Sequence, residues 1–235
     1  MKSPIIIGLS GKKQSGKDTV CQGLEEWFLS NYHPFEYSFE IYGFADSLKK
    51  QVCINTMGLT EKQCYGTDEE KNSLTKFKWE NLPDDIRYSN NLESEKIRKI
   101  GTTDEYEDFP VLRKGFMTAR EIMQVIGTDI FRNYFDDNIW VDSTFRKISY
   151  DNRNLALISD VRFPSEVNAI LNHNGCIIRL TRNICEQDEH PSETALDNYD
   201  FDNKEKVCII NNENINIDEQ NKIAIDYVKK ILENK

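Results

Sequence analysis

The chain has 235 residues, of which 38% are hydrophobic and 30% are charged, and its formal net charge is −10. This size predicts a single α/β domain, residues 1–235, that carries an insertion. No apolar run approaches the roughly 18 residues of a membrane helix, and the acidic balance argues against broad nucleic-acid binding. The six cysteines are scattered without a Cys-x-x-Cys pair, which favours reduced thiols and a cytoplasmic protein.

Apolar runs and helical periodicities alternate along the chain. We expect strands at 4–10, 36–44, 154–159, 175–180 and 206–210, and helices at 16–30, 45–57, 117–135, 165–173 and 218–232. This alternation predicts a parallel sheet with helices on both faces. Residues 59–115 are polar and poorly periodic, which indicates an insertion over the substrate site, and residues 182–202 form a polar loop.

A glycine-rich stretch, GLSGKKQSGKDTV, follows the first strand at Gly8. Gly11 and, four residues on, Gly16-Lys17 match a phosphate-binding loop, whose backbone N–H groups surround a β-phosphate while the next helix presents its positive end. Lys17 would reach the β- and γ-phosphates of ATP, with Ser15 in the same loop. The alternative is a glycine-rich turn without a ligand, which the flanking strand and helix make less attractive.

The residue after this lysine is Asp18, where the common loop has Ser or Thr. A carboxylate beside a triphosphate is repelled unless a cation lies between them. One interpretation is therefore that Asp18 helps to bind Mg²⁺, with the Thr19 hydroxyl nearby. The other is that Asp18 only lies in the first helical turn, where a negative charge suits the helix dipole. The sequence leaves both open.

Further motifs follow in order along the chain. They are Gly43-Phe44-Ala45-Asp46-Ser47-Leu48-Lys49, Tyr65-Gly66-Thr67-Asp68-Glu69-Glu70-Lys71, TAREIMQVIGTDIFR from Thr118 to Arg132, Trp140, and Ile158-Ser159-Asp160-Val161-Arg162-Phe163-Pro164. Together with SGKKQSGKDT they resemble the bacteriophage-type deoxynucleoside monophosphate kinases, from about residue 5 to residue 182. His190-Pro191-Ser192-Glu193 and the rest of the C-terminal part match less closely.

This resemblance implies a P-loop NTPase fold and transfer of the γ-phosphate of ATP to a deoxynucleoside monophosphate (dNMP), giving dNDP and ADP, with Mg²⁺ as cofactor. The residues that it places at ATP are Gln14, Gly16, Lys17, Asp18 and Thr19. Those that it places at the deoxynucleotide are Lys13, Ala45, Asp46, Lys71, Arg120, Gly127, Thr128, Arg132 and Trp140. ATP and dNMPs are then the partners, with no nucleic acid or membrane, and a homodimer is left open. A viral protein of this kind would act in the host cytoplasm.

The chemistry of such a transfer needs cations more than a base, because the acceptor phosphate is already largely dianionic at pH 7, with a second pKa near ~6. His33, His173 and His190 are isolated, which suits surface or packing roles. Arg120 and Arg132 stand about three turns apart on one predicted helix, roughly 18 Å along its axis, so a straight helix cannot bring both to one phosphate. We expect a break at Gly127-Thr128.

Asp160 ends an apolar strand, where α/β folds place ligand-facing residues, and suits a carboxylate that orders Mg²⁺. Arg162 is expected to clamp the transferring phosphate, although an ion pair with Asp160 is the alternative. Arg182 borders the loop 182–202, the place of a lid in related kinases. Two roles suit the ring of Trp140, stacking on the base and packing in the core, whereas Phe44, at a strand end, better suits the core.

Two other functions compete with this hypothesis. The animal-type phosphomevalonate kinases share the Ser-Gly-Lys-x-x-Ser-Gly-Lys-Asp loop and a Leu-Asp-Asn segment, which is present here at Leu196-Asp197-Asn198. A regulatory GTPase or ATPase is the second alternative, but no glycine stands three residues after an aspartate, and Val161 follows Asp160 where hydrolytic ATPases have glutamate. The sequence therefore favours a nucleotide kinase.

Overall fold

The computed structural model describes residues 4–33, 37–88, 94–98, 106–110, 112–182, 194–201 and 206–233. The chain divides into two compact units, which are described separately below. The first, the sheet unit, consists of Met1–Ser47 and Asp137–Lys235, and the second, the inserted unit, is Leu48–Asp136. Most of the loop predicted at 182–202, with His190 to Glu193, lies outside the described residues.

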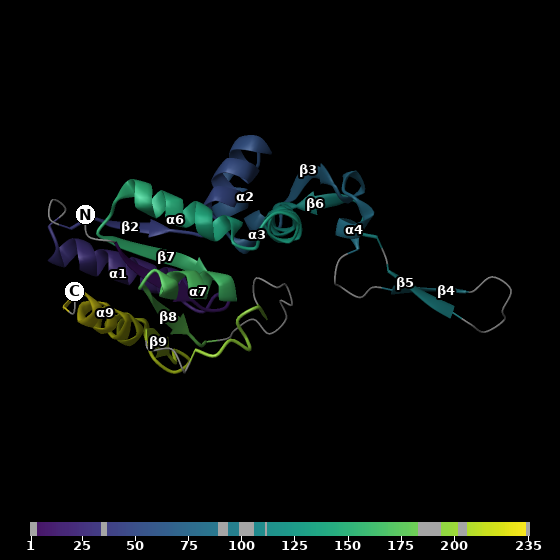
Figure 1. Ribbon diagram of the computed structural model, residues 1–235. Helices are drawn as coiled ribbons and strands as arrows, with labels where there is room; N and C mark the ends of the chain where they lie inside the picture. The colour runs from purple at the N-terminus through teal and green to yellow at the C-terminus, as the bar shows by residue number, and fades with distance from the viewer. Residues whose placement is uncertain are drawn as a thin grey trace. The chain divides into compact units, whose positions relative to one another are not determined.

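The sheet unit is built on five parallel strands in the order β2-β7-β1-β8-β9, labelled in Figure 1. Its elements are β1 (Ile5–Ser10), α1 (Lys17–Asn31), β2 (Phe39–Tyr42), α6 (Ile139–Asp151), β7 (Leu155–Val161), α7 (Pro164–Asn172), β8 (Cys176–Leu180), β9 (Val207–Ile210) and α9 (Ile217–Glu233). The central strand β1 pairs with β7 on one side and β8 on the other, so that Ile7 lies level with both Leu157 and Cys176. The predicted parallel sheet is confirmed.

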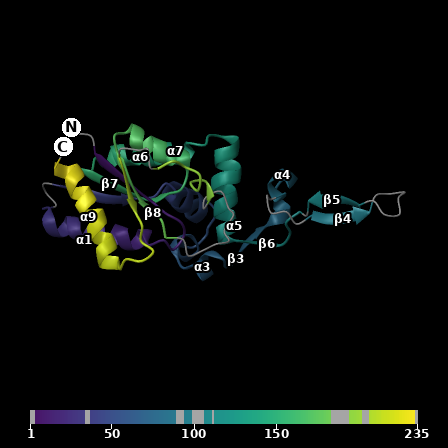
Figure 2. The same cartoon turned by 90° about the horizontal axis from the view of Figure 1, so that it is seen from below.

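Successive side chains of β1 pack alternately into two hydrophobic cores, one on each face of the sheet. Ile7 and Leu9 pack under α1 and α9, whereas Ile6 packs under α6 and α7. Figures 1 and 2 show these two helix pairs on opposite faces of the sheet. All three strand residues are almost fully buried, as expected for a central parallel strand covered on both faces. The helix α6 was not predicted from the sequence, although its buried Val141 and Ile148 lie two turns apart on one face.

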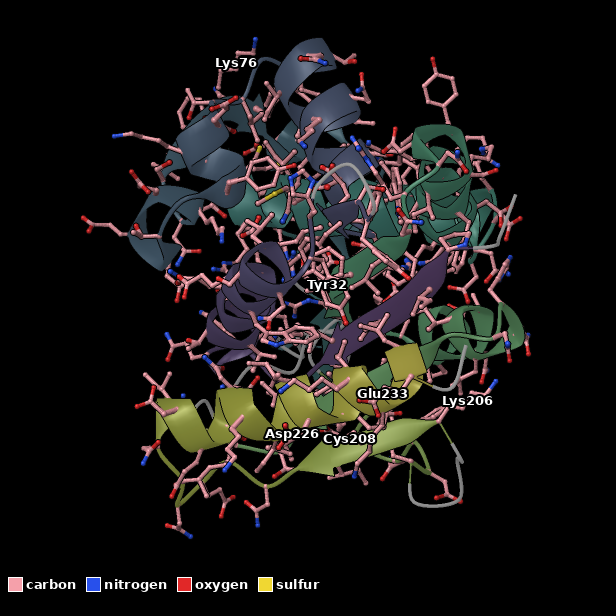
Figure 3. All side chains as sticks on the ribbon, turned by 90° about the vertical axis from the view of Figure 1, so that its left-hand side faces the viewer. Tyr32, Lys76, Lys206, Cys208, Asp226 and Glu233 are labelled. Atoms are coloured by element: carbon pink, nitrogen blue, oxygen red, sulfur yellow. The ribbon has the colours of Figure 1, made fainter. Side chains whose placement is uncertain are left out.

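The C-terminal helix α9 closes the face opposite α6 and α7. Figure 3 shows it lying over β9, with Asp226 and Glu233 on the helix and Cys208 on the strand. Ala224 and Val228 are the residues of α9 that are buried against the sheet. At the end of α1 the same core is extended by aromatic rings, because Phe28 stacks on Tyr32 with 4.8 Å between ring centroids. The last strand and helix thus belong to the same core as the first.

The inserted unit contains short helices and two antiparallel strand pairs, β3 with β6 and β4 with β5. Its elements are the π-helix η1 (Leu48–Thr56), α2 (Glu61–Tyr65), α3 (Asp68–Lys71), β3 (Leu74–Lys78), the 3₁₀-helix η2 (Trp79–Asn81), α4 (Asp84–Arg87), β4 (Ser94–Arg98), β5 (Tyr106–Pro110), β6 (Phe116–Thr118), α5 (Ala119–Gln124) and the π-helix η3 (Val125–Arg132). The antiparallel pairs were not predicted from the sequence.

The long helix expected at 117–135 is formed differently from the prediction. Its first residues belong to β6, Thr118 caps α5 through its side chain, and the helix then widens into a π-helix at Val125. The expected break at Gly127 is wrong, because the helical backbone runs on through it. Gly127 is buried, and a Cβ atom there would lie 2.6 Å from Leu48 Cδ2. The glycine therefore permits close packing on η1 and does not expose backbone.

Candidate active site

The loop between β1 and α1 has the backbone shape of an anion-binding site. Gln14 and Gly16 both have positive φ angles, 58° and 100°. Such left-handed residues turn successive N–H groups toward one side, and a non-glycine residue in this region is uncommon enough to suggest a functional constraint. A Cβ atom on Gly11 would lie only 2.4 Å from Ser15 Oγ, so the loop also requires glycine there. The geometry matches the predicted phosphate loop.

Lys17 is the first residue of α1 and is 9% exposed. Its Nζ donates to the carbonyl oxygens of Gly11 and Lys12, each over 2.7 Å. An ammonium group has three N–H bonds, so these two anchors hold the side chain inside its own loop with a donor to spare. The pKa of Lys17 is lowered to about 7, mainly by burial and then by the charge of Arg162, while the charges of Asp18 and Asp160 act in the opposite direction. The ammonium of Lys17 thus lies within the electrostatic reach of all three residues.

Residues from the end of the chain hold the phosphate loop in place. The buried Asn212 donates from Nδ2 to Ser15 O over 2.7 Å and to Gln220 Oε1 over 2.6 Å. Arg182 donates to Gln14 O over 3.3 Å, and its backbone N–H donates to Asn212 Oδ1 over 2.9 Å. None of these tethers was predicted. The only signal in the sequence was the position of Asn212 just after the last strand, at the edge where ligands bind to parallel sheets.

Asp160 lies near the carboxyl end of β7 and holds the turn that follows β2. Its Oδ1 accepts from Phe44 N over 2.6 Å, and its Oδ2 accepts from Ala45 N over 3.1 Å. In the same turn Asp46 Oδ2 accepts from Gly43 N over 3.2 Å. The structure thus brings together the predicted residues Ala45, Asp46 and Asp160. Phe44 is 2% exposed in the core, as expected from the sequence.

The side-chain oxygen atoms near the phosphate loop suit a hard cation such as Mg²⁺ as ligands. Asp18 is exposed in the first turn of α1, Thr19 follows it, and the electrostatic effects of both Asp18 and Asp160 reach Lys17. Mg²⁺ prefers oxygen ligands and usually takes one or two carboxylates together with substrate phosphates and water. Among the described residues no three carboxylate, histidine or cysteine side chains gather at one point. A kinase site for Mg²⁺ does not require such a cluster, so the residues fit the ion.

In the inserted unit the structure places Arg120 against α3, the short helix that ends at Lys71. Arg120 Nη2 donates to Asp68 Oδ1 over 2.6 Å and its Nε donates to Asn72 Oδ1 over 3.0 Å. These partners flank Lys71 on both sides along the chain. Two predicted substrate residues, Arg120 and Lys71, therefore belong to one local arrangement, although they are 49 positions apart in the sequence.

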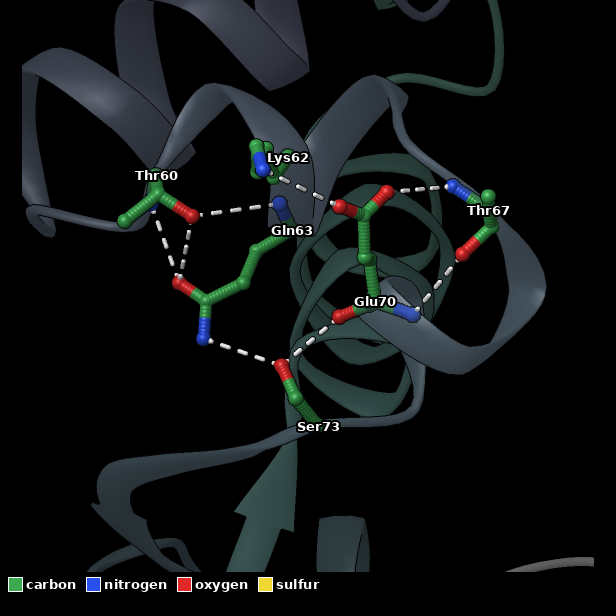
Figure 4. A network of polar contacts seen from close by, with 6 residues as sticks. All are labelled: Thr60, Lys62, Gln63, Thr67, Glu70 and Ser73. Atoms are coloured by element: carbon green, nitrogen blue, oxygen red, sulfur yellow. Dashed lines mark hydrogen bonds and ion pairs between the residues drawn. The ribbon is translucent and has the colours of Figure 1, made fainter.

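Two capping boxes build this arrangement (Figure 4). Thr60 and Gln63 cap α2, and Thr67 and Glu70 cap α3, in each case by reciprocal side-chain to backbone bonds. Ser73 joins the two, because its hydroxyl donates to Glu70 O over 2.7 Å and accepts from Gln63 Nε2 over 3.3 Å. Helices of four and five residues are too short to persist alone, so these caps fix the backbone that carries Lys71.

The remaining predicted residues are mostly buried. Arg132 ends η3 and is 7% exposed, Gly127 is buried within η3, and Thr128 is partly exposed beside it. Trp140 is the second residue of α6 in the sheet unit and is 6% exposed. His173 packs on Phe145 with 4.1 Å between ring centroids, as expected for a packing histidine.

This fold and this loop define the class: a phosphate loop between the first strand and first helix of a parallel α/β sheet is that of a P-loop kinase fold. Residues 67–223, more than half of the chain, match the family model described as deoxynucleotide monophosphate kinase. The chain therefore belongs to the deoxynucleotide monophosphate kinase family.

Curated relatives agree with the family. The chain is 29% identical over 226 residues to a putative deoxynucleotide monophosphate kinase of Acanthamoeba polyphaga mimivirus, covering 90% of each chain. It is 21% identical over 212 residues to the deoxynucleoside-5'-monophosphate kinase of Escherichia phage T5, covering 82% of this chain and 85% of the relative. The phosphomevalonate kinase alternative is not favoured. No helix among the described residues is long and apolar enough to cross a membrane.

Proposed function

We propose that this protein transfers the γ-phosphate of ATP to a deoxynucleoside monophosphate, giving the deoxynucleoside diphosphate and ADP. The observation that carries the proposal is the strained loop around Lys17, built as a phosphate site in a chain of this family. The printed names of the two relatives support the choice of acceptor. Mutual repulsion of two phosphate groups is the main barrier to bringing the reactants together, and cations lower it.

On the ATP side, we assign the backbone of Gly11 to Gly16 to the β-phosphate and Lys17 to the β- and γ-phosphates. Arg162 lies close enough to Lys17 to affect its pKa, which supports a role as a second cation on the transferring phosphate. Asp160 accepts hydrogen bonds from Phe44 N and Ala45 N, which fixes its carboxylate at the same end of the sheet. The acceptor phosphate is the nucleophile, so no protein base is needed.

On the acceptor side, we assign Lys71 and Arg120 to the dNMP, together with Lys13, Ala45, Asp46, Thr128, Arg132 and Trp140. Gly127 packs on Leu48, so we give it a structural role. The bonds from Arg120 to Asp68 and Asn72 hold its guanidinium beside the helix that carries Lys71. Two cations in one local arrangement are what a phosphate monoester requires. The burial of Trp140 weakens the case that its ring stacks on a base.

We assign Mg²⁺ to Asp18, Thr19 and Asp160. Held there, Mg²⁺ would supply positive charge to the phosphates of ATP during transfer. Asp18 occupies the place of the usual Ser or Thr and brings a full negative charge, which suits a site that also holds Lys17. ATP and dNMPs are the partners in this proposal, and because both relatives come from viruses we propose host cytoplasm as the place of action.

A coupled assay of ADP release tests this function. The purified chain is given ATP, Mg²⁺ and, in separate reactions, dGMP, dTMP, dCMP and phosphomevalonate. We expect turnover with at least one dNMP and slow hydrolysis without acceptor. Turnover of phosphomevalonate alone, or rapid ATP hydrolysis without acceptor, would refute the proposal. Loss of turnover in Lys17→Ala, with the fold retained, ties the activity to the phosphate loop.

A further inference from the structure

The Leu196-Asp197-Asn198 segment contacts the phosphate loop in this structure. Asp197 Oδ2 lies 3.0 Å from Lys12 Nζ, and Lys12 is the first residue after Gly11 in the loop. The residues are 185 positions apart in the sequence. Lys12 is not among the residues expected to bind either substrate, so this ion pair needs its own account.

Residues on either side of Asp197 anchor this segment to the sheet unit. Leu196 and Phe201 are buried in the core under α6 and α7, 5% and 8% exposed. Tyr199 donates from its hydroxyl to Asn168 on α7 over 2.7 Å. The carboxylate of Asp197 is therefore presented to the loop from a fixed support and not from a freely moving chain.

A second cation, Arg179, is affected by the charge of the same carboxylate. The guanidinium of Arg179, at the end of β8, donates to the buried Ser10 over 2.8 Å and lies 5.1 Å above the ring of Phe201. Burial lowers the pKa of Arg179, and the charge of Asp197 opposes this effect. The negative charge of Asp197 thus acts on two cations, Lys12 in the phosphate loop and Arg179 on β8.

We propose that Asp197 is a positioning residue for ATP, which acts through Lys12 to hold the first half of the phosphate loop in its binding shape. The inference rests on the proposed function only in that ATP is the ligand of the loop. The second half of the loop is already held by Asn212 and Arg182, at Ser15 O and Gln14 O. Lys17 Nζ also holds the carbonyl oxygens of Gly11 and Lys12, so the loss of Asp197 removes one of the tethers of the first half and leaves the side chain of Lys12 without this ion pair.

The position of the pair decides which measurement is informative. Lys12 and Asp197 side chains are 27% and 36% exposed, and ion pairs at such sites contribute little to global stability. The consequence is expected in the affinity for ATP, which depends on the loop N–H groups already pointing together. A positioning role therefore predicts a higher KM for ATP with kcat and the KM for the acceptor unchanged.

The experiment compares Asp197→Asn with Asp200→Asn, which makes the same charge change at an exposed residue of the same segment. We expect Asp197→Asn to raise the KM for ATP roughly threefold to fivefold at low salt, and Asp200→Asn to leave it unchanged. The conservative Asp197→Glu should restore part of the affinity. In a Lys12→Gln background, Asp197→Asn should have no further effect, because its partner is already missing.

The same variants are titrated with ADP by calorimetry, which needs no acceptor. If the wild type binds ADP but turns over no dNMP, the proposed function fails while the inference is still tested by the binding data. The inference is overturned if Asp197→Asn binds ADP as Asp200→Asn does, or if its effect is equally large with and without Lys12. An equal rise in the KM for ATP and for the acceptor would also overturn it, because that is the signature of general distortion.

Discussion

Asn212 Nδ2 and Ser15 O are 2.7 Å apart, and this hydrogen bond joins the segment between β9 and α9 to the second half of the phosphate loop. Both residues are buried, and Asn212 is also bound to Gln220 on α9. A Cβ atom on Gly16 would lie 3.2 Å from Gln220 Oε1, so helix α9 also packs closely under the loop. The C-terminal part of the chain thus supports a site whose sequence motif lies entirely in its first twenty residues.

Asn212→Ala tests this support. The substitution leaves the carbonyl of Ser15 and the amide of Gln220 without their buried partner, so we expect the free energy of unfolding to fall by about 1–3 kcal/mol. We also expect weaker ATP binding, because the loop loses its tether. Urea unfolding and ATP titration measure the two effects. The control is Asn211→Ala, an exposed neighbour, and equal effects of the two variants would contradict the prediction.

Lys17 makes stability depend on pH. Its pKa is about 7 in the folded chain and 10.5 in its ordinary state, so between these values the unfolded chain binds more protons. Compared with Lys17→Met, the wild type should therefore gain stability as the pH rises from 7 to 10, by at most about 1.4 kcal/mol per pH unit. Below pH 7 the difference should be constant, because the lysine is charged in both states.

Urea unfolding of the wild type and Lys17→Met at pH 6, 7, 8, 9 and 10 measures this difference. Groups shared by the two chains cancel, which leaves the titration of one ammonium group. Lys222→Met, an exposed position on α9, is the control and should give a difference that does not change with pH. A flat profile for Lys17→Met would mean that its ammonium is not buried in solution as it is here. Turnover should be lost in Lys17→Met at every pH.

The variant Asp18→Asn distinguishes the two interpretations of Asp18 that the sequence left open. If the carboxylate helps to hold Mg²⁺, Asp18→Asn should raise the Mg²⁺ concentration for half-maximal activity several-fold. If it only complements the dipole of α1, the change should instead lower the free energy of unfolding by about 0.3–1 kcal/mol with the same Mg²⁺ dependence. We expect the first result. Thr19→Val, which removes only the neighbouring hydroxyl, shows whether that group also contributes.

Arg120 is held by Asp68 and Asn72, so its loss could act on the acceptor or only on the backbone around Lys71. We expect Arg120→Ala to lower kcat/KM for the dNMP by at least about tenfold, as for the loss of a charge-assisted contact to phosphate. Asp68→Asn removes the ion pair but leaves the charge of Arg120 and its bond to Asn72 in place, so it should have a smaller effect. If both variants reduce kcat/KM equally, Arg120 only positions α3.

The sheet and the phosphate loop were predictable because their signals are local. Ile5 to Ile7 form an apolar run, Gly11 and Gly16 stand at fixed spacing, and an amphipathic helix follows. The supports of the site were not predictable, since Asn212 is 197 residues from Ser15 and Asp197 is 185 residues from Lys12. No spacing rule links such residues, because only the parallel order of the strands brings them together.

The structure of the inserted unit was hard to predict from the sequence for a different reason. Its helical periodicity from Thr118 onward was visible, but the periodicity does not reveal where an α-helix widens into a π-helix. That change depends on packing, here of Gly127 on Leu48. The β3–β6 pair was hidden for a related reason, because a partly polar strand of three residues has too short a pattern to stand out. Chemistry that depends on contiguous residues could be predicted from the sequence, whereas geometry that depends on packing could not.

The role of Arg132 is better tested by a conservative substitution than by removal of its side chain. Arg132→Ala would remove the predicted contact to the deoxynucleotide, but the side chain is 7% exposed at the end of η3. Removing a buried charge leaves its partners uncompensated and typically costs about 3–5 kcal/mol, so loss of activity in that variant would be ambiguous. Arg132→Lys keeps the charge but not the planar fork that binds phosphate through two parallel bonds. We expect it to retain most of the stability and to lose at least about tenfold in kcat, measured with saturating dNMP, and a lysine variant with full turnover would remove Arg132 from the phosphate clamp.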